Sequence, residues 1–223
     1  MSSDRRTPSP ADLATAARSA GVADERLLAA IAQVPRSLFV QAELAAHAYL
    51  DEPVRITHRQ ATTQPSLVAK MIESLALRGE EKLLEIGTGY GYQTAPLARL
   101  AREVFSLELW QDMRDAAWPS LNAIGVSNVT LLAGDGTRGV PDQTPFDAII
   151  VTAAFPSVPP PLAKQLVRGG RLVQPIGPGG REDVRLFEKD GNKLAAIRSI
   201  TAAYFVHLYG KHGYPLAQAP AEP

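Results

Sequence analysis

The sequence contains no cysteine among its 223 residues. This absence excludes disulfide bonds, metal sites built on thiolates and a cysteine nucleophile. An excess of charge of one sign is also missing, because 23 Lys and Arg residues balance 23 Asp and Glu residues. Such a balance gives no electrostatic signal for nucleic acid or for an anionic membrane. We therefore expect no nucleic-acid partner, and no cluster of residues indicates a metal site.

Long apolar runs are scarce as well. The longest, such as Ala148–Phe155, are far shorter than a membrane-spanning helix requires. The opening MSSDRRTPSP carries charge and proline, and no apolar stretch of a secretory signal follows it. These features predict a cytoplasmic protein without a membrane partner. A chain of 223 residues, 45% of them hydrophobic, suits one α/β domain with a sizeable core.

Composition along the chain predicts the domain limits. Residues 1–10 are rich in proline and small polar residues, which predicts a disordered tail, and residues 214–223 predict a flexible tail for the same reason. The single domain between them spans residues 11–213. We expect residues 11–80 to form a helical cap and a substrate loop, and residues 81–213 to form a Rossmann-like core.

Hydrophobic periodicity predicts helices in the first third of the chain and alternating strands and helices thereafter. Helical spacing ends at Pro35 and resumes after Pro65. The expected strands are Lys82–Ile86, Val104–Glu108, Val129–Leu132, Asp147–Thr152 and Arg171–Pro175. The helices expected between them are Gln93–Ala101, Gln111–Ile124 and Pro161–Val167.

This alternation is typical of βαβ units, which form a mostly parallel sheet with helices on both faces. Two later runs, Val184–Glu188 and Ala202–Tyr209, look like strands with no helix between them. They indicate an antiparallel end to the sheet. The predicted fold class is therefore α/β, a doubly wound and mostly parallel sheet with an N-terminal helical cap and antiparallel C-terminal strands.

The clearest local motif is LLEIGTGYGY, at Leu83–Tyr92. Gly87, Gly89 and Gly91 follow a predicted strand and open the next helix, which permits a tight turn and close approach of a ligand to the backbone. The nicotinamide fingerprint needs a glycine at position 92, which is tyrosine here. G-x-G-x-G after an acid instead resembles the first motif of Rossmann-like methyltransferases. A glycine-rich turn without a ligand is the alternative.

Two acids follow at the ends of later strands. Glu108 lies 23 residues after Glu85, where a carboxylate is placed to accept hydrogen bonds from ribose hydroxyls. Asp135 follows the third strand, where it is placed to accept from the adenine amino group. A solvated charge at 108 and a turn-forming Asp-Gly pair at 135 are the alternatives. Together the motifs predict S-adenosyl-L-methionine as cofactor, with S-adenosyl-L-homocysteine as product. The expected cofactor-binding residues are Glu85, Gly87, Thr88, Gly89, Glu108, Asp135 and Gly136.

Further stretches resemble one family, the protein-L-isoaspartate O-methyltransferases, from about Val34 to Tyr214. The most specific are VPRSLFV at Val34–Val40 and the VTAA of FDAIIVTAAFPSVPPPL at Phe146–Leu162. The others are AYLD at Ala48–Asp51, the Gln64-Pro65 pair, GDG at Gly134–Gly136, GGRLVQPIG at Gly169–Gly177 and YFVHLYG at Tyr204–Gly210. The resemblance implies methyl transfer to the free carboxylate of isoaspartyl residues in damaged proteins. We expect the enzyme to be a monomer.

The segment from Ile56 to Pro65 departs from the family pattern, which is close to I-G-H-G-Q-T-I-S-Q-P. Both glycines are replaced, by Thr57 and Arg59, and Thr63 stands where the family has a serine beside the acceptor carboxylate. The resemblance therefore implies that Thr63 orients the acceptor as the catalytic residue. We expect Arg59 to favour acidic peptides. The expected substrate-binding residues are Gln60, Thr62, Gln64, Thr152, Ala153 and Ala154.

A carboxylate acceptor is ionised at neutral pH, so the reaction needs no general base. His58, a loop histidine, is accordingly interpreted as a structural hydrogen-bonding group. Two alternatives stay open because of the altered loop. One is a related enzyme that methylates a carboxylate of a biosynthetic peptide, and the other is a catalytically silent protein that binds the cofactor without turnover.

Overall fold

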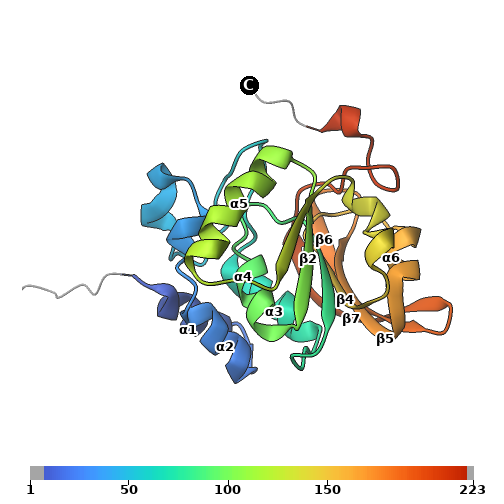
Figure 1. The fold of residues 1–223 in the computed structure, drawn as a ribbon, viewed down its shortest axis with the longest axis horizontal. Coiled ribbons are helices and arrows are strands. Elements are labelled where there is room, and N and C mark those ends of the chain that lie inside the picture. Colours follow the sequence, from blue (N-terminus) through green and yellow to red (C-terminus); the bar gives the residue numbers. More distant parts are fainter. Residues whose placement is uncertain (1–7, 220–223) are drawn as a thin grey trace, which may run out of the picture.

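The computed structural model describes residues 8–219, and Figure 1 shows its α/β architecture. Six α-helices lie within these residues: α1 Pro10–Ser19, α2 Glu25–Ala32, α3 Pro65–Ser74, α4 Thr94–Leu100, α5 Gln111–Ala123 and α6 Pro160–Gln165. The strands are β1 Lys82–Ile86, β2 Glu103–Glu108, β3 Val129–Ala133, β4 Phe146–Val151, β5 Leu166–Ile176, β6 Arg181–Asp190 and β7 Lys193–Tyr204. None of the described helices is long and apolar enough to cross a membrane.

The strands form one sheet in the order β3-β2-β1-β4-β5-β6-β7. The first five pair in parallel, and β6 and β7 continue the sheet in the antiparallel sense. The chain order therefore reverses between β1 and β4, so the carboxyl ends of these two strands meet at a crevice. Ligands of open α/β sheets bind at such a point. The predicted fold class is confirmed, including the antiparallel end.

The sheet is covered on both faces because neighbouring residues along a strand point in opposite directions. On β1, Leu83 belongs to the larger core, which α1 to α5 cover, while Leu84 and Ile86 belong to a second core under α6. Figure 1 shows α1 to α5 on one side of the sheet and α6 on the other. Glu85 lies among these apolar residues and is fully buried.

The last strand differs from the prediction. A strand was expected at Ala202–Tyr209, but β7 spans Lys193–Tyr204, and the chain then crosses to the end of β4. There the Ala154 amide donates to the Val206 carbonyl, and the Leu208 amide donates to the Ala154 carbonyl. Most of β7 is exposed at the edge of the sheet, so its sequence lacks the alternation of polar and apolar residues that would have revealed it.

Both predicted tails contain ordered residues. Helix α1 begins at Pro10, because the Ser9 backbone amide and hydroxyl donate to the Asp12 carboxylate and close a capping box. A short 3₁₀ turn at Leu216–Gln218 follows Tyr214. The rest of the predicted tails, residues 1–7 and 220–223, lies outside the described residues. The limits of the domain and its division at residue 80 stay predictions.

Candidate functional site

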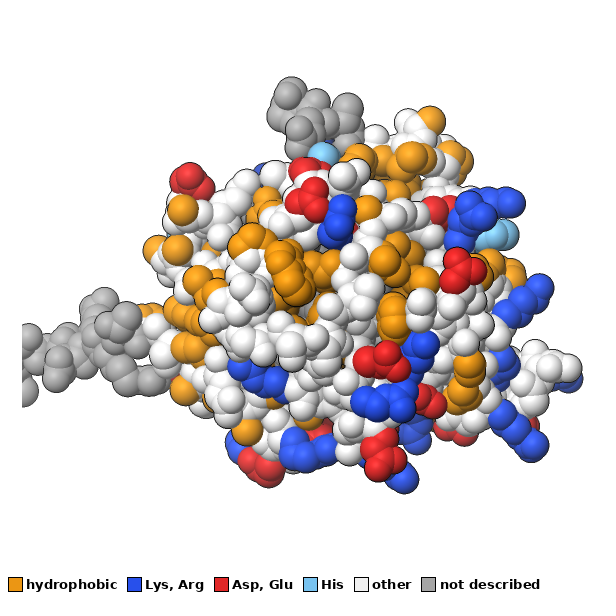
Figure 2. Space-filling view, viewed as in Figure 1, with side chains coloured by type: hydrophobic (Ala, Val, Ile, Leu, Met, Phe, Trp, Pro, Cys, Tyr) orange, Lys and Arg blue, Asp and Glu red, His pale blue; other side chains and the backbone are white. Residues whose placement is uncertain are grey.

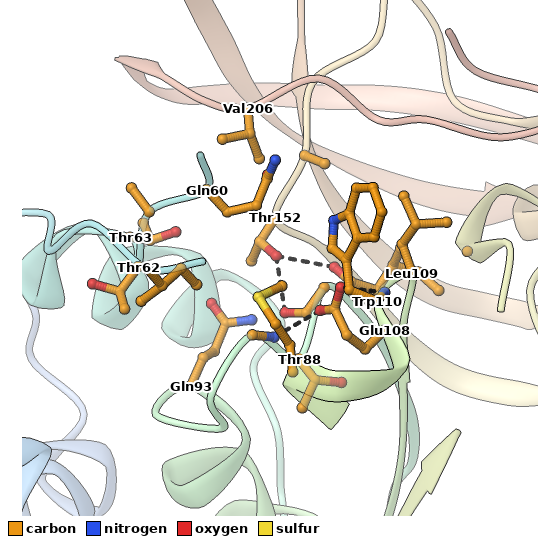
Figure 3. Close-up of a pocket in the computed structure, with 18 of the residues that line it drawn as sticks. Gln60, Thr62, Thr63, Thr88, Gln93, Glu108, Leu109, Trp110, Thr152 and Val206 are labelled. Carbon is orange, nitrogen blue, oxygen red and sulfur yellow. Dashed lines mark hydrogen bonds between the residues drawn. The ribbon is translucent and has the colours of Figure 1, made fainter. Parts of the chain in front are cut away.

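A cavity lies at the carboxyl ends of the central strands, where the strand order reverses. Gly87 follows β1, Glu108 ends β2, Thr152 follows β4 and Gly136 follows β3, and all four line this cavity. Figure 3 shows Thr62 and Thr63 on one side of it, Glu108 and Trp110 on the other, and Thr152 between them. The alternating elements thus bring together residues that lie far apart in the sequence, at the edge where a ligand is expected.

The glycine loop forms one wall of the cavity. Gly87 has φ +97° and Gly89 has φ +55°, conformations in which L side chains are strained. A Cβ atom at Gly87 would also overlap Thr152 Oγ1. That hydroxyl donates to the carbonyls of Ile86 at 3.0 Å and Gly87 at 3.2 Å. The two strand ends are therefore fastened together, and only glycine fits at position 87.

Glu108 faces the cavity from the end of β2. It is 4% exposed, and its carboxylate accepts from the Gly89 amide at 2.8 Å and from the Trp110 amide at 3.1 Å. Burial raises the pKa of this carboxyl group, while the backbone hydrogen bonds from Gly89, Trp110 and Leu109 lower it. A buried acid that is fixed by two amides presents oriented acceptor oxygens to hydroxyl groups of a ligand.

Glu85 lies beneath the cavity, and it is not one of the residues that line it. Its carboxylate accepts from Gln93 at 2.9 Å, from Thr94 at 2.6 Å and from Ser106 at 2.6 Å. Burial raises the pKa of Glu85 to about 7, against these three hydrogen bonds, which lower it. Ser106 in turn lies 2.5 Å from the Thr88 hydroxyl. Glu85 therefore supports Gln93 and Thr88 from below, and its assignment to cofactor binding stays a prediction.

Asp135 is also absent from the residues that line the cavity, although its neighbour Gly136 is present. Its carboxylate accepts from the Thr137 amide at 2.9 Å, the Thr137 hydroxyl at 2.6 Å and the Lys211 amide at 2.8 Å. The acid thus caps the turn Gly136–Arg138 and holds the C-terminal loop. The turn-forming alternative describes these contacts of Asp135, and its contact with adenine stays a prediction.

The structure adds cavity residues that the sequence analysis missed. Trp110 and Met113 continue the wall beyond Glu108, and Gln93, Val206 and His207 close other sides. An aromatic residue two positions after the acid of β2 was a readable signal for Trp110. Gln93 donates to Glu85 through Nε2, but its Oε1 is buried and receives no hydrogen bond from a described residue. An unpaired buried acceptor at a cavity fits a ligand that carries a hydrogen-bond donor.

His58 holds the substrate loop against the rim of the cavity. Its ring stacks on Trp110, with centroids 4.1 Å apart and an interplanar angle of 3°, and its Nε2 lies 2.9 Å from the Asp112 carboxylate. The contacts join the loop to the first turn of α5. They agree with the structural interpretation of His58. Arg59, the next residue, is exposed and lines neither this cavity nor the groove described below.

The two threonines of the substrate loop differ in their hydrogen bonds. The Thr62 hydroxyl accepts from Arg36 at 2.7 Å and from the Val54 amide at 3.1 Å, so it fixes the loop. The Thr63 hydroxyl makes no hydrogen bond with any residue between 8 and 219. Both line the cavity, as does Gln60, whose amide donates to the His58 carbonyl at 2.9 Å.

Of the remaining predicted substrate residues, some line the cavity and others do not. Thr152 and Ala153 line the cavity, whereas Ala154 is fully buried in the crossing with Val206 and Leu208. Gln64 donates to Asp51 at 2.9 Å, yet it lines a second depression. Ala154 therefore supports the site from behind, and Gln64 belongs to the neighbouring groove.

This second depression adjoins the cavity, and we call it the peptide groove. One wall is the substrate loop with Leu67 of α3, and the other runs along the end of β7. The residues that line both spaces are Ala61, Thr62, Thr63, Thr152 and Val206. The Thr63 hydroxyl thus stands where the two spaces meet, and a group that enters along the groove reaches the cavity there.

The fold and the site define a class I, Rossmann-like methyltransferase that uses S-adenosyl-L-methionine. The family model of protein-L-isoaspartate(D-aspartate) O-methyltransferase matches residues 9–213. The chain belongs to this family, and it is a carboxyl O-methyltransferase by class.

Relatives and solved structures agree with this assignment. A protein-L-isoaspartate O-methyltransferase of Methanoculleus marisnigri is 45% identical over 198 residues, which cover 88% of this chain and 89% of that protein. A solved structure of a protein-L-isoaspartate O-methyltransferase superposes with a TM-score of 0.82 at 28% identity, over 92% of this chain and 67% of that one. A Plasmodium falciparum protein assigned to the same family, in complex with S-adenosyl-L-homocysteine, has the same fold with a TM-score of 0.75 at 19% identity, over 90% of this chain and 98% of that one.

Proposed function

We propose that this chain methylates the free carboxylate of L-isoaspartyl residues in damaged proteins, with S-adenosyl-L-methionine as methyl donor. The family assignment supports this reaction. The observation that carries it in the structure is the junction of the cavity with the peptide groove, at Thr63 and Thr152.

The residues of the cavity fit the cofactor. We assign Gly87, Thr88, Gly89, Glu108 and Gly136 to its binding, with Trp110, Met113 and Gln93 added to the predicted set. When bound, S-adenosyl-L-methionine supplies an electrophilic methyl group on a sulfonium. Glu108 accepts hydrogen bonds from ligand hydroxyls, and Gln93 Oε1 accepts one from a ligand donor. Glu85 acts through Gln93 and Thr88 as a positioning residue.

The protein's part in the reaction is alignment. An acceptor carboxylate is already ionised at neutral pH, so no side chain has to remove a proton. Thr63 donates its hydroxyl hydrogen to one carboxylate oxygen, which turns the other oxygen toward the cavity. Holding reacting groups in line can contribute about 7–11 kcal/mol to catalysis. Thr152 and Val206 close the junction and exclude water from it.

An isoaspartyl residue carries its free carboxylate on the α-carbon, and its backbone is longer by one methylene than that of aspartyl. A site whose polar groups pair with this backbone discriminates strongly, because the normal isomer leaves them unpaired. The direct test is methyl transfer to a synthetic isoaspartyl peptide and to its aspartyl twin. We expect transfer to the first well above the second. Inactivity on a panel of isoaspartyl peptides, with the cofactor bound, would contradict the proposal and favour a dedicated peptide acceptor or a silent protein.

Replacing Glu108 by alanine should weaken binding of S-adenosyl-L-homocysteine by about 1–3 kcal/mol, because hydrogen bonds to a charged acceptor are lost. Glu103→Ala provides a matched control, since Glu103 lies at the opposite end of the same strand. Titration calorimetry measures both affinities. Equal affinity in the two variants would remove Glu108 from the cofactor site.

Replacing Thr63 by valine should reduce kcat by about 10- to 100-fold, which corresponds to a hydrogen bond of about 1.5–3 kcal/mol to a charged group. Valine keeps the shape of threonine and lacks its hydroxyl. Thr63→Ser should retain most turnover, and both variants should bind the cofactor as the wild type does. Steady-state kinetics on an isoaspartyl peptide and calorimetry test this. Normal turnover of Thr63→Val would assign the orienting role to another residue.

A further inference from the structure

The peptide groove carries one charged side chain among the residues that line it. These residues are Pro53, Ala61, Thr62, Thr63, Gln64, Leu67, Thr152, Arg181, Ala202, Ala203, Tyr204, Phe205 and Val206. Arg181, at the start of β6, is the only one that is ionised at neutral pH. A single cation in an otherwise uncharged groove gives the groove an electrostatic preference for anionic groups.

Arg181 is exposed, and no described residue forms an ion pair or a side-chain hydrogen bond with it. Arginines nearby are paired, since Arg185 on the same strand contacts Asp183 at 2.5 Å and Arg171 on β5 lies 3.6 Å from Glu188. Figure 2 shows the same mixing of basic and acidic side chains over one face of the molecule. The Arg181 guanidinium thus keeps its hydrogen-bond donors for a partner from outside the chain.

The residues around Arg181 hold this wall of the peptide groove in place. Arg181 pairs directly with Tyr204 across β6 and β7, and Tyr204 is 76% exposed, so a cation and an aromatic ring lie side by side at the groove. The next residue, Glu182, points into the protein, where it is 1% exposed and accepts from the Phe205 amide at 3.0 Å. Because Glu182 holds the segment that leaves β7, the wall is preformed.

We propose that Arg181 reads an acidic side chain of the substrate peptide, a short distance along the chain from the isoaspartyl residue. This inference rests on the proposed function and adds a residue that determines specificity. The sequence had suggested Arg59 for the same preference, but Arg59 lies outside both the cavity and the groove. The guanidinium pairs with carboxylates through a planar fork of donors, which a glutamate or aspartate of the peptide matches.

The test compares kcat/KM for isoaspartyl peptides that carry Glu, Gln or Lys, one position at a time, at the three positions on each side of the isoaspartyl residue. An exposed ion pair of this kind is worth about a 2- to 5-fold preference for Glu over Gln at one of these positions. The preference should shrink as salt is added, because ions screen exposed charges. The neutral Gln peptide serves as the reference for each enzyme.

Arg181→Gln should abolish the preference, and Arg181→Glu should reverse it in favour of the Lys peptide. Arg59→Gln makes the same change of charge outside the groove. The preference of this variant for the Glu peptide should therefore match that of the wild type. If Arg181→Gln keeps the preference, or if the wild type treats all three peptides alike, Arg181 does not read the peptide. Turnover of the neutral isoaspartyl peptide separates these outcomes from a failure of the proposed function, in which no isoaspartyl peptide is methylated by any variant.

Discussion

Replacing Arg36 with methionine should lower the free energy of unfolding by about 3 kcal/mol or more and reduce methyl transfer at the same time. Arg36 is fully buried. Its guanidinium donates to the carbonyls of Ala48 at 3.2 Å, Leu50 at 3.0 Å and Glu52 at 2.9 Å, and to the Thr62 hydroxyl at 2.7 Å. One side chain therefore gathers the whole segment that leads into the substrate loop.

Whether Arg36→Met lowers or raises the free energy of unfolding depends on two opposing effects. Burial lowers the pKa of the Arg36 guanidinium, which shows that its charge is poorly solvated, and a methionine would relieve that cost. The Tyr92 ring, with its centroid 5.2 Å away, and the Asp51 carboxylate offset part of this cost. However, methionine would leave three backbone carbonyls without this donor and would remove one of the two donors to the Thr62 hydroxyl, and each buried unpaired acceptor costs about 1–3 kcal/mol. The lost hydrogen bonds outweigh the relief.

Thermal melting measures the loss of stability in Arg36→Met, and turnover measures the loss of methyl transfer. For a chain of this length, a loss of about 3 kcal/mol corresponds to a fall in Tm of roughly 6–12 °C. Arg18→Met is the matched control, because Arg18 makes an exposed ion pair with Glu25 and should leave the Tm nearly unchanged. Arg36→Met should also lower kcat, since the Thr62 hydroxyl, beside Thr63, loses one of its two donors. If Arg36→Met melts together with the control, the buried guanidinium does not stabilise the loop.

The central strands β1, β2 and β4 could be predicted because they are buried on both faces, and because Gly87 follows β1 and β2 ends in Glu108. Glu108 and the glycine loop stand at strand ends, so their positions in the sequence already place them at the cavity. Glu85 stands inside its strand, one residue before Ile86. Strand alternation puts its side chain on the face opposite to Leu84 and Ile86, under the helices, and this was the available signal that it does not line the cavity.

Contacts between distant segments could not be predicted in the same way. The Asp135 carboxylate is held by the amide of Lys211, 76 residues later, and an Asp-Gly pair alone does not distinguish a cap from a ligand contact. Arg181 reaches the peptide groove only through the register of β6 with β7. Because the exposed strand β7 lacks a clear pattern, its register, and with it the groove wall, was invisible in the sequence.

Replacing Gly87 with alanine should weaken binding of S-adenosyl-L-homocysteine by about 3 kcal/mol, or roughly 100-fold, and abolish detectable methyl transfer. Two costs add at this position. The backbone has φ +97°, where an L residue is strained by about 1–3 kcal/mol. The new Cβ would also overlap Thr152 Oγ1, which itself bonds the Ile86 and Gly87 carbonyls. Either the glycine loop or the end of β4 must move, and both line the cofactor cavity.

A double-mutant cycle with Thr152→Ala separates the two costs. Removing the threonine hydroxyl removes the overlapping atom, while the backbone strain at position 87 stays. Calorimetry should therefore show the Gly87→Ala/Thr152→Ala enzyme binding S-adenosyl-L-homocysteine more tightly than Gly87→Ala alone, although Thr152→Ala by itself should weaken binding slightly. If the second substitution adds to the damage of the first, the overlap is not the cause. The intolerance of position 87 would then come from its backbone conformation alone, and Thr152 would contribute to cofactor binding independently of it.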